Sequence, residues 1–116
     1  MDHVAARIAM NQARFREANE EIEPKAVVAG VQSIPFICEC ADPGCTRIIR
    51  VTPQEYEAVR AEPVLFLNAL GHEERSSEYS EVVSENDRFV VTRKIGDAAQ
   101  IVRSLDPREG DDADVA

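Results

Sequence analysis

The chain has 116 residues, a length that suits one domain, and 44% of them are hydrophobic. Its 22 acidic residues outnumber 13 basic ones, and the resulting formal net charge of −9 disfavours a general role in binding DNA or RNA. No stretch approaches the ~20 apolar residues of a membrane span, and the N-terminus lacks the pattern of a secretory signal. We therefore expect a cytoplasmic protein with no membrane partner.

Residues 4–23 are predicted to form an amphipathic helix. Apolar residues recur at helical spacing along one stripe, through Val4, Ile8, Phe15, Ala18 and Ile22. Charged residues, Arg16 among them, would occupy the other sides. Pro24 and Gly30 then predict a loop or a short broken helical turn over residues 24–33.

The next segment is typical of a β-hairpin. Residues 34–40 and 46–51 have strand-like sequences, and Asp42-Pro43-Gly44 between them favours a tight turn. The cysteines of the chain would then lie at the turn end of this hairpin.

A second helix should begin after Thr52. Thr52 can cap the helix, Pro53 suits its first position, and Glu55 completes a capping box. This helix should reach about Ala61, because the residue before Pro63 disfavours helical geometry. Its inner face would carry Tyr56 and Val59.

The C-terminal half alternates short apolar and polar segments. Residues 64–67 and 89–94 are predicted strands, and residues 97–105 a last helix. The acidic stretch 73–87 is expected to contain a helical turn anchored by Tyr79, Val82 and Val83. Residues 106–116, with five acids and one arginine, should form a disordered tail.

Together these elements predict a small α+β domain over residues 1–105. Residues 1–23 supply the amphipathic helix and residues 34–105 the core, which contains the cysteine-bearing hairpin, a short second helix and a further β-rich segment. Zinc is expected to stabilise this lean core, since the chain contains no tryptophan and only four phenylalanines.

Three cysteines, Cys38, Cys40 and Cys45, fall within eight residues around the predicted turn. An odd, clustered set is atypical of an oxidised secreted domain and points to metal or redox chemistry in a reducing compartment. Thiolates are preferred ligands of Zn²⁺, and a turn tip is an unusual place for core packing. We predict one structural Zn²⁺ ion. Redox sensing and plain packing of the cysteines are the alternatives.

His72 is the best candidate for the fourth ligand, because Gly71 before it permits close approach of the backbone. His3, the carboxylates of Asp42 and Glu73, or a water molecule are the other candidates. Four protein ligands would leave no open position for a substrate, which favours a structural over a catalytic metal. The sequence also contains no phosphate-binding loop, nucleophile elbow or zinc-protease motif, so we expect no enzyme activity.

Several of these motifs resemble those of a group of small uncharacterised actinobacterial proteins. The resemblance spans about residues 10–95 and rests on the segments Phe36-x-Cys38-Glu39-Cys40-x4-Cys45, Thr52-x-x-Glu55-Tyr56-Glu57-x-Val59-Arg60 and Gly71-His72-Glu73. Leu70 replaces the proline that is usual before Gly-His in that group. The resemblance supports the ligand set Cys38, Cys40, Cys45 and His72, and it implies no particular function.

The expected function is that of a non-enzymatic zinc module that binds a protein partner or a second copy of itself, with regulation of transcription or stress response as candidate settings. A nucleic-acid-binding zinc module is the main alternative. It would use a basic face formed by Arg47, Arg50, Arg60, Arg93 and Lys94. A thiol/zinc redox sensor is a further alternative.

Overall fold

The computed structural model describes residues 3–73 and 78–108, which contain three helices and five strands. Their order is α1 (His3–Val28), β1 (Ile34–Ile37), β2 (Ile48–Val51), α2 (Pro53–Val59), β3 (Leu65–Ala69), β4 (Ser80–Glu85), β5 (Phe89–Lys94) and α3 (Gly96–Ser104). The predicted α+β class is confirmed.

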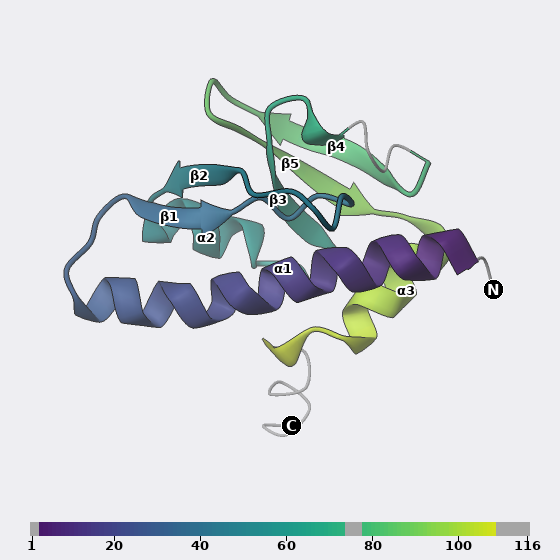
Figure 1. Ribbon diagram of the computed structural model, residues 1–116, viewed down its shortest axis with the longest axis horizontal. Coiled ribbons are helices and arrows are strands. Elements are labelled where there is room, and N and C mark those ends of the chain that lie inside the picture. The colour runs from purple at the N-terminus through teal and green to yellow at the C-terminus, as the bar shows by residue number, and fades with distance from the viewer. Residues whose placement is uncertain (1–2, 74–77, 109–116) are drawn as a thin grey trace.

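The strands form two separate antiparallel sheets that lie along one long helix. β1 and β2 make a two-stranded hairpin, and the second sheet has the order β3-β5-β4. In Figure 1, α1 runs horizontally, with the hairpin above its C-terminal half, the three-stranded sheet above its N-terminal half and α3 below it. The helix thus bridges both sheets.

β3 is buried along its whole length because both faces of its sheet are covered. One face carries Leu65 and Leu67 into a cluster with the hairpin and α2, where the rings of Phe36 and Tyr56 stack with centroids 4.2 Å apart. The opposite face carries Phe66 into a second cluster formed with α1 and α3. The sheet is therefore the middle layer of three.

α1 is longer than predicted, since the helix passes through Pro24 and ends at Val28. Its end is set by Gly30, whose φ of +79° is in the left-handed region. Gly30 N donates to Val27 O and Val31 N donates to Ala26 O, the paired bonds of a Schellman motif. The expected loop at residues 24–28 was therefore wrong.

No helix in the described ranges has the length and hydropathy to cross a bilayer.

The predicted apolar stripe of α1 lies at the margin of its buried face, so this prediction was right only in part: Ile8, Phe15 and Ala18 are half-buried, and Ile22 packs against the core. Val4 is 51% exposed, whereas Arg16, expected on an outer side, has no exposed surface. The buried side consists of small and polar residues, namely Ala5, Ala9, Gln12, Ala13, Arg16 and Asn19. Alanines allow the helix to approach its neighbouring elements closely. The polar side chains bond to backbone groups of β1, the cysteine loop and α3.

The hairpin and α2 match the sequence-based expectations closely. β1 pairs with β2 in the register Ile34 to Val51, and the cysteines lie in the connecting loop. Thr52 caps α2: its hydroxyl accepts from Glu55 N, and Thr52 N donates to the Glu55 carboxylate. Both predicted inward residues, Tyr56 and Val59, are buried.

The helical turn expected within residues 73–87 was wrong, because residues 80–85 form strand β4 paired with β5. A register shift between Val82 and Ser84 leaves Val83 as an extra residue in the strand. The bulge coincides with two successive valines in the sequence, which interrupt the alternation of polar and apolar residues by which a strand is recognised. Residues 74–77 of the same stretch lie outside the described residues.

The first residues of the predicted tail pack against the domain. The Asp106 carboxylate accepts a 2.6 Å bond from buried Arg60, and Arg108 forms ion pairs with glutamates of α1 and α2, namely Glu20, Glu23 and Glu57. These contacts attach residues 106–108 to both helices. Residues 109–116 lie outside the described part of the chain.

Glu23 gives this junction a pH dependence that can be measured. The pKa of Glu23 is raised from 4.5 to about 7 by partial burial, by a hydrogen bond to Glu57 and by the negative charge of Glu57, although Arg108 opposes the shift. The folded protein thus holds the proton of Glu23 more tightly than the unfolded chain does. The contribution of Glu23 to the free energy of unfolding therefore declines as pH rises from 4.5 to about 7. Because Gln keeps a neutral donor, the melting temperature of Glu23→Gln relative to wild type should rise over this interval.

Thermal melts across this interval test the expectation, with Glu17→Gln as the control because Glu17 is an exposed acid on the same helix. Parallel curves for wild type and Glu23→Gln would contradict it.

Candidate metal centre

The loop that follows β1 is fixed to the neighbouring strand β3 by Glu39. Glu39 N donates to Leu67 O at 2.7 Å, and the Glu39 carboxylate accepts from Leu67 N at 2.9 Å. The Glu39 side chain is therefore directed into the interior, where it is completely buried. Its two neighbours, Cys38 and Cys40, belong to a different group of side chains on the other side of the loop.

Two side chains of α1 form hydrogen bonds with the same segment. Asn19 Nδ2 donates to Ile37 O and to the Glu39 carboxylate, and Asn19 Oδ1 accepts from Ile37 N, each at 2.8 Å. Gln12 Nε2 donates to Glu39 O at 3.0 Å. The loop backbone next to the cysteines is thus positioned by a helix that begins more than thirty residues earlier.

The turn that returns Cys45 to the other two cysteines is closed by Asp42. Asp42 O accepts from Cys45 N at 3.1 Å, and Asp42 Oδ1 accepts from Gly44 N at 2.9 Å. This is the turn chemistry that the sequence predicted for Asp-Pro-Gly. The Asp42 carboxylate is therefore engaged in the turn.

His72 reaches the cluster from the end of β3. The chain turns at Gly71, whose φ of +85° is accessible to glycine at little cost. The His72 Nδ1 atom lies 3.4 Å from Cys38 Sγ and 3.5 Å from Cys45 Sγ. Ala69 N, at the end of the same strand, donates to Cys38 Sγ at 3.2 Å.

One potential ligand atom from each of Cys38, Cys40, Cys45 and His72 lies within 4.8 Å of the other three. In a tetrahedral zinc site with Zn–S of about 2.3 Å and Zn–N of about 2.0 Å, neighbouring ligand atoms are about 3.5–3.8 Å apart. The distances from the imidazole to the thiols agree with this geometry. The four residues that the sequence selected are therefore brought together at distances compatible with a metal site.

The thiols influence one another's ionisation. A hydrogen bond from Cys38 lowers the pKa of Cys40, further helped by the Asp42 backbone N–H. The same bond, together with burial and the nearby thiols, raises the pKa of Cys38. The cluster thus favours ionisation of one thiol, that of Cys40, and opposes ionisation of a second, that of Cys38. A divalent cation would remove this opposition, because it stabilises every thiolate that coordinates it.

The other candidates for the fourth ligand are not part of this group within the described residues. His3 lies exposed at the start of α1, and neither the Asp42 nor the Glu73 carboxylate belongs to the cluster. The structure thus places His72, and no other described histidine or acid, beside the three cysteines.

The five basic residues considered for nucleic-acid binding are not gathered on one face. Arg60 is buried against Glu20 and Asp106, and Lys94 is only 2% exposed, with a pKa lowered by burial to about 8. Arg93 is half-buried and pairs with Glu62 at 3.2 Å. Only Arg47 and Arg50 are well exposed, and Arg50 donates to Ser33 O.

Sequence reasoning missed the polar residues that position the cysteine loop. Gln12 and Asn19 make these contacts, and they share one face of α1 with Arg16 and with Ala5, Ala9 and Ala13. A stripe of small and polar residues at this spacing was the available signal, but large apolar residues elsewhere on the helix obscured it.

Comparisons with protein-family models, curated proteins and solved structures gave no match for this chain. The resemblance noted from the sequence therefore stays a prediction, and the functional argument rests on the residues themselves.

Proposed function

We propose that the protein is a non-enzymatic zinc-binding module that acts through contacts with other proteins. One Zn²⁺ ion would be held by Cys38, Cys40, Cys45 and His72. The observation that supports this most directly is the convergence of the four donor atoms within 4.8 Å, from two segments far apart in the sequence. Candidate settings are the regulation of transcription or of stress responses.

The ion would connect the two sheets of the fold. Cys38, Cys40 and Cys45 belong to the hairpin loop, whereas His72 follows the last residue of β3 in the other sheet. A bond from each side to one ion would restrain their separation, which otherwise depends on Glu39 and a limited hydrophobic core. This is the role of a structural metal, in which binding energy becomes folding energy.

One feature disfavours catalysis, and a second disfavours binding to nucleic acids. Three thiolates and one imidazole complete a tetrahedron and leave no position for a substrate or an activated water. The net charge of −9 keeps the surface acidic and disfavours long-range attraction of nucleic acids. A small acidic domain with a closed metal site is suited to recognising another polypeptide.

The proposal is tested by the metal content of purified protein. Wild type expressed with ample zinc should contain one equivalent of zinc by elemental analysis. His72→Ala should hold zinc at least about tenfold more weakly in competition with a chromogenic chelator, because one ligand is lost. His3→Ala is the matched control, since His3 is exposed and outside the cluster. Wild-type protein without zinc would overturn the proposal.

A thiol/zinc redox sensor is the second candidate, and the exposure of the site favours it. Cys45 and His72 are only half-buried, so a small oxidant could reach one side of the cluster. Hydrogen peroxide would take two electrons from two zinc-bound thiolates, giving one disulfide and two hydroxide ions, with release of zinc. Retention of zinc under peroxide that oxidises free cysteine would exclude this role.

A further inference from the structure

The two outer edges of the three-stranded sheet are treated differently. The edge at β3 is covered by the cysteine loop, because Leu67 N and Leu67 O both bond to Glu39 and Ala69 N bonds to Cys38 Sγ. The edge at β4 pairs with no other strand of the described residues. Five of the six residues of β4 are exposed, from Glu81 to Glu85. β4 is thus the open edge of the sheet.

The hydrogen-bond alternation indicates which backbone groups of β4 point outward. Ile95 N donates to Tyr79 O at one end of the ladder, and Asn86 N donates to Phe89 O at the other. In an antiparallel ladder, pairs that bond across the strands alternate with pairs that do not. The backbone N–H and C=O groups of Val82 and Glu85 therefore point away from β5, toward the open edge.

A groove adjoins this edge on the face that also carries α2. Its volume is about 330 Å³, and its apolar lining consists of Ala58, Val59, Leu65, Val83, Phe89 and Val91. Val83 reaches the groove because the bulge inserts it between Val82 and Ser84, which changes the face to which the strand directs its side chains. An open edge beside an apolar groove is suited to an added strand with alternating side chains.

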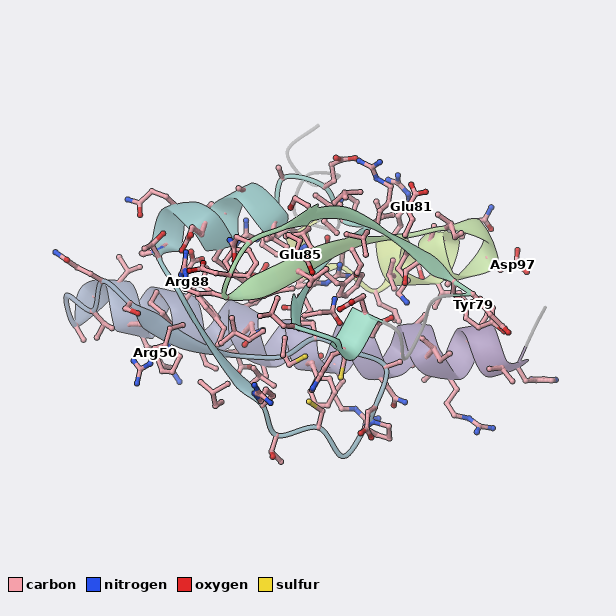
Figure 2. The ribbon with its side chains drawn as sticks, turned by 90° about the horizontal axis from the view of Figure 1, so that it is seen from above. Arg50, Tyr79, Glu81, Glu85, Arg88 and Asp97 are labelled. Carbon is pink, nitrogen blue, oxygen red and sulfur yellow. The ribbon has the colours of Figure 1, made fainter. Side chains whose placement is uncertain are left out.

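Acidic side chains accompany the open edge. Figure 2 shows Glu81 and Glu85 spaced along β4, with Arg88 at the hairpin end. Glu81 is 56% exposed despite an Arg93 nitrogen 3.9 Å away, and Glu85 is also exposed. Arg88, by contrast, is engaged with Glu55. Glu81 shares Arg93 with Glu62, so the edge presents a net negative charge to whatever pairs with it.

This charge decides between the possible occupants. A second copy would bring its own Glu81 and Glu85 to the same edge, and the negative charge on both strands would oppose their pairing. The chain's own C-terminal residues 109–116 contain four acids and no base, so they would be repelled as well. A basic segment of another protein complements the edge.

We propose that β4 and the adjoining groove bind an extended basic peptide segment of a partner protein as an additional β-strand. The peptide pairs with the backbone of Val82 and Glu85 and places an apolar side chain in the groove beside Val83. Its basic side chains lie on both faces of the added strand, toward Glu81 on the groove side of the sheet and toward Glu85 on the opposite side. This deepens the proposed function, because it names the surface and the chemistry of the partner for a module already proposed to bind proteins.

The probe is a fluorescein-labelled lysine-rich octapeptide with valine at positions 4 and 6, so that both valines share one face and lysines lie on both faces. It is titrated into zinc-loaded protein and followed by fluorescence anisotropy. The same peptide with glutamate in place of lysine is the control ligand. Saturable binding of the lysine peptide alone, with slower amide hydrogen exchange at Val82 and Glu85, is expected. Absence of binding, or binding without these exchange changes, overturns the proposal.

Two variants separate strand pairing from general attraction by charge. Val82→Pro removes an outward N–H while leaving the bonds to β5, so binding should weaken about tenfold. Glu81→Gln combined with Glu85→Gln should weaken binding and reduce its dependence on salt. Glu21→Gln, an exposed acid on α1, is the control and should have no effect.

Equal binding by all the variants would mean that the peptide binds elsewhere, and the proposal would be wrong. Zinc content is measured on each sample. A zinc-loaded protein that ignores the peptide contradicts only this inference, whereas a zinc-free wild type contradicts the proposed function itself.

Discussion

Removal of the proposed zinc ion should unfold the domain or separate its two sheets. Structural zinc contributes on the order of 10 kcal/mol in zinc-finger peptides, and the whole stability of a typical domain is about 5–15 kcal/mol. The ion proposed here would connect the cysteine loop to the end of β3, in addition to the hydrogen bonds of Glu39 and the shared hydrophobic cluster. A strong chelator should therefore abolish the cooperative thermal transition in circular dichroism.

The result should be reversible and specific for the ion. Adding zinc back should restore the transition, whereas magnesium, which prefers oxygen ligands, should not. Cys38→Ser should give the same loss without chelator, since Cys38 is a buried member of the cluster. Acidification should release the metal, because protons compete for the thiolates. An unchanged melting temperature in chelator would show that the fold does not depend on a metal.

Replacement of Arg16 by methionine should be the most damaging change outside the metal cluster. Arg16 is completely buried; its Nη1 atom donates to Pro63 O, and its Nη2 atom donates to Val102 O at 2.9 Å. Its guanidinium also lies 4.4 Å from the centroid of the Phe66 ring. Methionine preserves much of the volume but leaves two buried carbonyl groups without their donor. We expect a loss of about 3 kcal/mol.

Urea unfolding at constant zinc measures this effect. Arg14→Met is the matched control, because Arg14 is exposed on the same helix and should change stability by less than about 0.5 kcal/mol. Arg16→Lys should also be destabilising, since an ammonium group cannot reproduce the fork that reaches two carbonyls. If Arg16→Met were as stable as Arg14→Met, the two buried hydrogen bonds would be unimportant.

The contacts of Arg16 explain why the first helix has a polar buried face. The side chains of Gln12, Arg16 and Asn19 end on backbone groups of loops and helix ends, which have no partners within a regular ladder. Buried carbonyls and amides must be satisfied, and side chains from a neighbouring element are one way to achieve this. α1 thus stabilises the irregular segments of the fold, including the cysteine loop.

The parts of the fold that could be predicted are those with local causes. Thr52 and Glu55 cap α2 through their own neighbours, Asp42 closes its own turn, and residues 89–94 form a strand that begins with aromatic and β-branched residues. β4 could not be predicted, because its bulge interrupts the alternation and its pairing with β5 supplies the ordering energy. The end of α1 was misplaced since the proline was weighed more heavily than Gly30.

The amino-acid sequence alone was sufficient to identify the cysteine cluster, because Cys38, Cys40 and Cys45 lie within one turn whose geometry is set by Asp-Pro-Gly. It could name His72 only as one candidate among several. Only the tertiary structure brought that imidazole within 3.5 Å of two thiols, since its position depends on β3 lying beside the loop. Likewise, the choice of Arg16 rather than Val4 for the interior follows from which backbone groups α1 meets, and a linear pattern contains no information about those partners.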